Sequence, residues 1–386
     1  YLSDVDGDPL RKPGLSGAFV GARERLLAEV VRPAFARYRD VLDTEIAPHG
    51  RAEDRPGLCW LPDGQASYAA LVRVYTTTDR TPEELHRTGL ELIDTIDQEY
   101  AEIGSRVFGV GTAAEVRHRL RTDAALRWHD EEELLTAARA TVRRAEGVAP
   151  DWFGRLPEGG CAVEPVPVTD APNAAPGYYM RPALDGSRPG TYFANTYRAE
   201  ERDRFFVEAL SFHEAVPGHH FQISLAQQLT ELPMLRRHAR VNAYTEGWGL
   251  YSERLADEMG LYSGDLARLG MLAQDSMRAA RLVVDTGLHA MGWSRQRVVD
   301  YLRANTVVPE VDIKSETDRY IEWPGQALSY MVGRLEIRRL RDLAKRTLGD
   351  AFDIKEFHDL VLGGGPLPMT VLADVVDRWL SAANQR

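Results

Sequence analysis

The stretch "SFHEAVPGHHFQ", residues 211–222, places three histidines and one glutamate within eight positions. The helix of a typical zinc peptidase carries a histidine, a glutamate beside it, and a second histidine four positions after the first. His213 and Glu214 match the first half of this pattern, but the residue four positions after His213 is Pro217. The stretch therefore predicts a variant metal motif, on condition that the helix is interrupted.

Two histidines are candidates for the second ligand. In a regular helix, a residue six positions after His213 lies roughly 120° away around the axis, and one seven positions after it lies roughly 10 Å along the axis. Neither His219 nor His220 could then share one ion with His213. Pro217 removes a backbone donor and Gly218 tolerates irregular dihedral angles, so we expect the helix to unwind at these two residues.

A third ligand is expected from a later helix, because a catalytic zinc site has three protein ligands and an open position for water. The segment "VNAYTEGWGLYSERLADEMG", residues 241–260, offers Glu246, and Glu253 is a competing acid on the same helical face. Glu246 is preferred because Gly247 leaves room for the close approach of another helix. Glu253 is then expected to hold a histidine ligand through its other ring nitrogen.

The composition limits the class of protein and its partners. The chain has 386 residues, a net charge of −11 and 44% hydrophobic residues. The acidic balance argues against nucleic acid as a partner. No apolar run reaches about 18 residues, so no membrane span is predicted. Cys59 and Cys161 occur in dissimilar contexts, which favours a reducing compartment and a cytoplasmic location. Because the chain begins at Tyr1 rather than methionine, a removed signal peptide is the alternative. The oligomeric state is left open.

The fold class predicted from the sequence is mostly α. Apolar residues at helical spacing indicate a helix within 15–48. Thr81 is a plausible N-cap, followed by Pro82, and Glu84 completes a capping box. Further helices are expected near 113–121 and 130–145, and again after residue 200, with loops near 230–234, 305–315 and 363–368.

A short β region interrupts the helices. Residues 149–200 are rich in Pro and Gly and contain short β-prone runs, which indicate a small antiparallel sheet with a turn at Asp185-Gly186. We therefore divide the chain into two parts. Residues 1–148 form an N-terminal helical part that is expected to cover a cleft. Residues 149–386 combine the sheet with the metal-binding helices, and the two parts are expected to form one continuous globule.

Five separated motifs resemble one bacterial family. They are "HEAVPGHHFQ" (213–222), "YTEGWGLYSERL" (244–255), "DGSRPGTYFANTY" (185–197), "RLVVDTGLHAMGWS" (281–294) and "WPGQALSYMVGRLEI" (323–337). Together they resemble domain of unknown function 885 (DUF885), whose members are regarded as zinc-dependent metallopeptidases. That family resembles the helical gluzincin peptidases, such as the thermostable carboxypeptidases and the oligopeptidases related to neurolysin. The resemblance implies a gluzincin-like fold, one Zn²⁺ ion, and a small antiparallel sheet that lines an active-site cleft.

The resemblance also implies a particular ligand set. Gluzincins carry Gly-His as the second half of the zinc helix, which matches Gly218-His219 and favours His219 over His220. A glutamate on the next long helix completes their site, and Glu246 matches it. The implied metal ligands are therefore His213, His219 and Glu246. This chain departs from the pattern because it has two extra residues between the halves of the motif.

Three further residues have predicted roles in catalysis. Glu214 is expected to act as the general base toward zinc-bound water. Tyr330 matches a tyrosine before a glycine in the helical carboxypeptidases and is a candidate oxyanion donor. His289 lies four residues after Asp285 on one helical face, so it could contact the oxyanion or form a structural pair with that carboxylate. For Tyr330, the alternative is an ordinary core tyrosine.

Substrate contacts are predicted at two places. Arg278, Arg281 and Arg334 are candidates for gripping a terminal carboxylate in bidentate fashion. The segment "TYFANTY", which holds Tyr192 and Asn195, is expected to form an edge strand that pairs with the substrate backbone. An ordinary structural role is the alternative for each of these residues.

These observations predict a zinc-dependent hydrolase that cleaves a peptide or peptide-like amide bond, with a carboxypeptidase as one form of it. Two alternatives are kept. One is an amide hydrolase that acts on a specialised small molecule in a biosynthetic pathway. The other is a non-catalytic metal-binding relative, against which an intact Glu214 speaks, since a binding protein needs no base.

Overall fold

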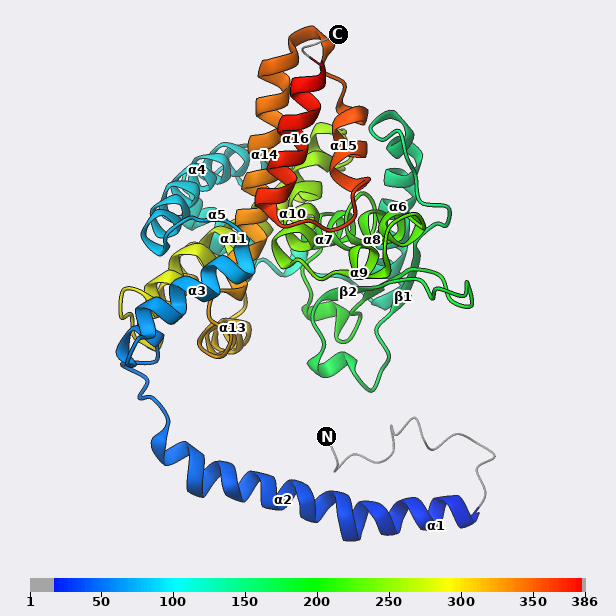
Figure 1. Cartoon of the computed structure of the whole chain (residues 1–386). Coiled ribbons are helices and arrows are strands. Elements are labelled where there is room, and N and C mark those ends of the chain that lie inside the picture. Colours follow the sequence, from blue (N-terminus) through cyan, green and yellow to red (C-terminus); the bar gives the residue numbers. More distant parts are fainter. Residues whose placement is uncertain (1–16, 384–386) are drawn as a thin grey trace.

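The computed structural model describes residues 17–383, and most of these residues are helical, as predicted (Figure 1). Two π-helical turns, Leu27–Val31 and Leu42–Ile46, interrupt or extend the first helices. The α-helices are α1 Gly17–Leu26, α2 Arg32–Val41, α3 Gly64–Thr76, α4 Pro82–Phe108, α5 Ala113–Thr122, α6 Glu131–Val148, α7 Phe206–Glu214, α8 His219–Gln228, α9 Met234–His238, α10 Asn242–Glu258, α11 Asp265–His289, α12 Arg295–Asn305, α13 Glu310–Glu322, α14 Ser329–Leu348, α15 Ile354–Leu362 and α16 Met369–Ala383.

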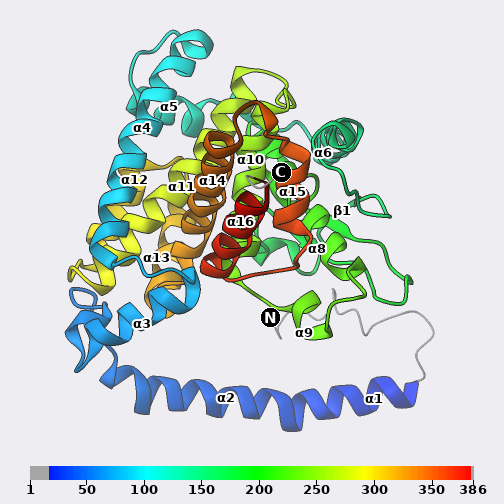
Figure 2. The same ribbon diagram turned by 45° about the horizontal axis from the view of Figure 1, so that its top comes forward.

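Helices α10, α11 and α14 form the centre of the molecule. α11 packs along α4 and α7, and α10 packs along α14 and α7. Between Leu269 and His289, α11 is buried on nearly every side, as expected of a helix in the middle of a core. α16 packs on the outer side of α14 (Figure 2). The main core includes residues from both predicted parts of the chain, from Tyr68 to Leu380.

The predicted start of α4 is confirmed. The hydroxyl of Thr81 accepts a hydrogen bond from the backbone N–H of Glu84 (3.2 Å), and the Glu84 carboxylate accepts one from the backbone N–H of Thr81 (2.9 Å). This reciprocal pair is a complete capping box. The predicted loops near 230–234 and 363–368 are present, whereas the loop near 305–315 is shorter, because α13 begins at Glu310.

The small sheet is mixed, so the prediction of an antiparallel sheet is wrong in part. Its strands are β1 (Ala162–Pro165), β2 (Gly177–Met180) and β3 (Thr191–Ala194), in the order β1-β3-β2. β2 and β3 form the antiparallel hairpin that the turn at Asp185-Gly186 predicts, but β1 pairs in parallel with β3. The long connection from β1 to β2 allows β1 to lie on the far side of β3.

The N-terminal helices α1 and α2 form one long rod that runs below the rest of the molecule in both views and is separate from it (Figures 1 and 2). Among the described residues of this rod, only Arg23 is buried, and large apolar side chains such as Phe35 and Tyr38 are exposed. The apolar spacing correctly predicts a helix here. It does not specify a partner for the helix, and within residues 17–383 the rod makes no extensive contact with the body. In residues 17–383, no helix combines the length and apolar character that crossing a bilayer requires.

Candidate metal centre

The helix breaks at the predicted residues. α7 ends at Glu214 and α8 begins at His219, with Ala215 and Gly218 in non-helical conformations between them. A Cβ on Gly218 would lie 1.9 Å from the carbonyl oxygen of His213, so the chain folds back directly onto the end of α7. Only glycine fits such a close approach of two backbones. The bend brings the first residue of α8 next to the last turn of α7.

Helix α10 holds the bend in place. The indole N–H of Trp248 donates to the carbonyl oxygen of Pro217 (2.8 Å), and the hydroxyl of Ser252 donates to the same atom (3.3 Å). Both donors are buried and lie four residues apart, on one face of α10. Trp248 and Ser252 belong to the motif that contains Glu246, but the sequence analysis did not predict their hydrogen bonds to Pro217. Their spacing of four residues on the predicted helix is the signal that could have indicated a shared partner.

The bend gathers three possible metal ligands, His213, His219 and Glu246. The Oε2 atom of Glu246 lies 3.7 Å from Nε2 of His213 and 3.6 Å from Nε2 of His219. One ligand atom from each residue lies within 4.8 Å of the other two. Tetrahedral ligands about 2.0–2.1 Å from a zinc ion lie roughly 3.3 Å apart. Two imidazoles and a carboxylate at these separations therefore fit a zinc ion after small movements.

His213 is fixed by a second carboxylate. Its Nδ1 atom forms a hydrogen bond with Oε1 of the fully buried Glu253 (2.7 Å). A Cβ on Gly249 would lie 2.7 Å from Cε1 of the ring, so glycine at this position leaves the space that the imidazole fills. A histidine ligand commonly binds a carboxylate through its second nitrogen in this way. This geometry matches the predicted role of Glu253 behind the histidine rather than on the metal.

His220 faces away from the cluster. Its Nδ1 atom lies 3.0 Å from the hydroxyl of Tyr179 on β2, and its Nε2 atom lies 3.0 Å from the carbonyl oxygen of Gly159. Burial lowers the pKa of His220, which favours the neutral ring. The structure therefore places His219, and not His220, beside His213.

Helices α10 and α14 lie very close together at the residue after Glu246. A Cβ on Gly247 would lie 2.5 Å from the backbone of Gly333 on α14, so the predicted close approach at Gly247 is present. Burial raises the pKa of Glu246, but hydrogen bonding and charge from His213 and His219 outweigh it and hold the pKa well below its usual range. The carboxylate is therefore ionised, as a metal ligand must be.

Glu214 is buried beside the same cluster and has no fixed partner in the described residues. Its side chain is 8% exposed, and no hydrogen bond to its carboxylate is formed within residues 17–383. Burial raises its pKa, while the nearby charges of His219 and His213 act in the opposite direction. A buried carboxylate of raised pKa that is free to exchange a proton suits a general base.

The predicted catalytic roles of His289 and Tyr330 find less support. Nδ1 of His289 accepts from the backbone N–H of Leu58 (3.1 Å), and Nε2 donates to the carbonyl oxygen of Tyr320 (2.9 Å). The ring is fully buried, so both nitrogens serve the fold, and the predicted pair with Asp285 is not formed. Asp285 instead accepts from the Tyr68 hydroxyl and from the backbone N–H of Gly325. Tyr330 is partly exposed and stays a candidate.

Two of the three predicted arginines are paired with acids. Arg281 binds Glu316 (2.9 Å), and its guanidinium lies 4.7 Å from the ring centre of Tyr330. Arg334 donates to the fully buried Asp275. Arg278 forms no ion pair with any carboxylate in residues 17–383, and its Nη1 donates to the side-chain oxygen of Gln274.

The predicted substrate contacts on the sheet are contradicted in part. β3 is the central strand and is paired on both sides, so it is not an edge that could bind a substrate backbone. The side-chain amide of Asn195 donates to the carbonyl oxygens of Ala171, Ala174 and Ala175, at 2.9–3.2 Å. It therefore holds the loop before β2. Tyr192 is 1% exposed, and burial together with the charge of the nearby Glu214 raises the pKa of its hydroxyl, so this side chain lies near Glu214.

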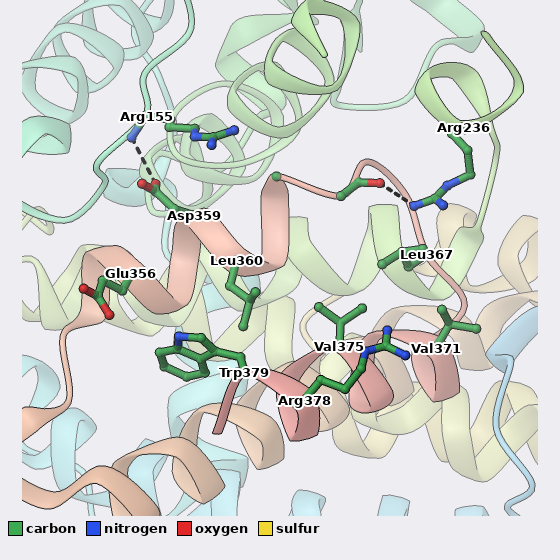
Figure 3. Close-up of a pocket in the computed structure, with 12 residues that line it drawn as sticks. Arg155, Arg236, Glu356, Asp359, Leu360, Leu367, Val371, Val375, Arg378 and Trp379 are labelled. Atoms are coloured by element: carbon green, nitrogen blue, oxygen red, sulfur yellow. Dashed lines mark hydrogen bonds between the residues drawn. The ribbon is translucent and has the colours of Figure 1, made fainter. Parts of the chain in front are cut away.

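A groove of about 590 Å³ lies elsewhere, between α15 and α16 (Figure 3). Leu360, Val375 and Trp379 contribute apolar walls, and Arg236 and Arg378 lie at its rim. None of the candidate metal ligands lines this groove, so its shape does not bear on the chemistry of the metal centre.

Comparison with known proteins defines the family. The chain belongs to the family described as "Bacterial protein of unknown function (DUF885)", which matches residues 11–376. None of the curated proteins compared with the chain matches it.

Two solved structures are similar to the chain. "The putative lipoprotein from Colwellia psychrerythraea" is 35% identical, with a TM-score of 0.91 over 97% of this chain. "A putative lipoprotein of unknown function from Shewanella oneidensis" is 17% identical, with a TM-score of 0.73 over 97% of this chain, and shows likeness of fold alone. The chain spans 65% and 70% of the lengths of these two proteins. Because the Colwellia protein, which is 35% identical over 97% of this chain, is described as a putative lipoprotein, the predicted cytoplasmic location is contradicted.

Proposed function

We propose that the protein is a zinc-dependent hydrolase that cleaves peptide or peptide-like amide bonds. The observation that carries this proposal is the convergence of His213, His219 and Glu246 around one point, with the buried Glu214 beside them. The ligands come from α7, α8 and α10, which supports a helical arrangement of the gluzincin kind. The closeness of Tyr192 on β3 to Glu214 supports the view that the sheet lies along one side of the site.

The residues of the chain divide the chemistry between them. A zinc ion bound here would lower the pKa of its water and polarise the substrate carbonyl. Glu214 would take the proton from that water and return it to the leaving amine. Glu253 orients the imidazole of His213, so that its Nε2 atom faces the cluster. Burial of the pocket strengthens each of these electrostatic contacts.

Substitution of Glu214 by glutamine tests the proposal. The variant should fold, bind one zinc ion per chain and lose hydrolysis of a short-peptide panel by at least about a hundredfold, since general-base catalysis contributes about 10²–10⁴-fold. Removal of zinc by a chelator should abolish the activity of the unaltered protein, and added zinc should restore it. Full activity of Glu214→Gln, or a protein that takes up no metal, would refute the proposal.

A further inference from the structure

The free edge of Arg278 is an unexplained charged feature near the candidate metal centre. Nη1 donates to Gln274, whereas Nη2 has no hydrogen bond within residues 17–383 and the buried Nε has no partner. Arg281 and Arg334 each bind a carboxylate. A buried donor without an acceptor is costly. The described residues supply no acceptor for the Nε–Nη2 edge of Arg278, so this edge could bind an anionic group from outside the fold.

The position of Arg278 is level with the metal centre. α11 and α7 touch where Gly270 meets Phe205, because a Cβ on Gly270 would lie 1.7 Å from the Phe205 carbonyl oxygen. Ion pairs between α10 and α11, Asp257 with Arg268 (2.7 Å) and Arg254 with Asp275 (2.5 Å), show that these two helices run in opposite directions. Gly249 lies five residues before Arg254 on α10, and a Cβ there would lie 2.7 Å from the ring of His213. His213 is therefore level with the turn of α11 that follows Asp275, which contains Arg278.

The chemistry of the free edge identifies the group that it would bind. Nε and Nη2 of a guanidinium present two parallel N–H donors, which match the two oxygens of a carboxylate. Gln274 fixes the opposite side of the guanidinium, so the edge has a defined orientation. A neutral amide in place of the carboxylate would supply one acceptor oxygen and no charge.

We propose that Arg278 binds a free carboxylate of the substrate, next to the amide bond that is cleaved at the metal centre. This inference rests on the proposed hydrolase function and specifies its substrate class. The substrates are peptides, or amides like them, that carry a carboxylate close to the scissile bond. Arg278 is then a specificity residue, and its loss affects acids more than the corresponding amides.

A pair of thiol probes tests the inference without knowledge of the natural substrate. The probes are 2-benzyl-3-sulfanylpropanoic acid and its carboxamide, whose thiolates both bind zinc while only the acid offers a carboxylate. Calorimetry on the zinc-loaded protein measures both dissociation constants. The acid should bind about tenfold to a hundredfold more tightly than the amide, which is the range for a hydrogen-bonded charge pair.

Variants separate the role of Arg278 from a general effect. Arg278→Gln should bring the preference for the acid below about threefold, and Arg278→Lys should keep part of it. Arg338→Gln is the matched control, because Arg338 is an exposed residue of α14 that pairs with Asp342, and it should keep the full preference. The comparison of acid and amide in the unaltered protein stands even if Arg278→Gln does not fold.

The outcomes distinguish this inference from the proposed function. A zinc-loaded protein that binds acid and amide equally, or binds neither, overturns the inference and leaves the hydrolase proposal standing. Persistence of the preference in a folded Arg278→Gln variant also overturns it. A protein that takes up no zinc refutes both.

Discussion

Replacement of Gly218 by alanine tests the bend that creates the metal centre. The new Cβ would lie 1.9 Å from the His213 carbonyl oxygen and 2.4 Å from that of Phe212, both of them backbone atoms. Real Cβ contacts are essentially never shorter than 3.0 Å, so α8 must move by at least 1.1 Å, the difference between 3.0 and 1.9 Å. Metal–ligand distances tolerate only about 0.2 Å. We expect a cost of about 1–3 kcal/mol, equivalent to roughly fivefold to 150-fold in zinc affinity if all of it falls on metal binding.

The assay for Gly218→Ala combines two measurements. Competition with a chromogenic chelator gives the zinc dissociation constant, and urea unfolding of the metal-free protein gives the free energy of unfolding. The cost should appear as a higher zinc dissociation constant, as a lower free energy of unfolding, or as both. Gly147→Ala is the matched control, because Gly147 lies in α6 with no atom within 4 Å of the new Cβ. It should stabilise the protein by about 0.5–1 kcal/mol. If Gly218→Ala leaves both quantities unchanged, the described bend is wrong.

Two further predictions follow from the histidines. His219→Gln should lose stoichiometric zinc, whereas His220→Gln should retain one ion per chain by atomic absorption; equal zinc content in both would contradict the ligand assignment. Separately, burial lowers the pKa of His358 to about 3, so its neutral ring adds stability that is complete above pH 6.5 and is lost as the pH falls toward 3. From pH 7.5 to pH 5 this loss is about 2 kcal/mol. Urea unfolding of His358→Gln should show a pH dependence flatter than that of the unaltered protein by this amount, and an identical dependence would contradict it.

Local signals in the sequence predicted the parts of the site that depend on neighbouring residues. A Pro-Gly pair inside a helix disrupts its hydrogen bonding, so Pro217 and Gly218 were enough to predict the break between α7 and α8 from the sequence. The capping box at Thr81 is likewise a local pattern. Gly247 indicated a close helix contact, although its partner, Gly333, could not be identified, because that contact joins residues far apart in the chain.

Residues whose roles depend on distant partners were harder to assign. The helical spacing of Asp285 and His289 suggested a pair, but Tyr68, Gly325, Leu58 and the Tyr320 carbonyl compete for their hydrogen bonds. The order of three short strands was similarly open, because a turn specifies only the hairpin that it closes. For the rod formed by α1 and α2, periodicity predicted a helix and gave no information about what the helix contacts.

The two imidazoles of the metal centre differ in their freedom to turn. The ring of His213 is fixed by Glu253 and by the space beside Gly249, whereas the buried Nδ1 of His219 has no hydrogen-bond partner among the described residues. If a zinc ion binds as proposed, it would meet one ligand already in its final orientation and a second that settles afterwards. Rotation of His219, the ligand with fewer restraints, would then set how long the ion stays bound.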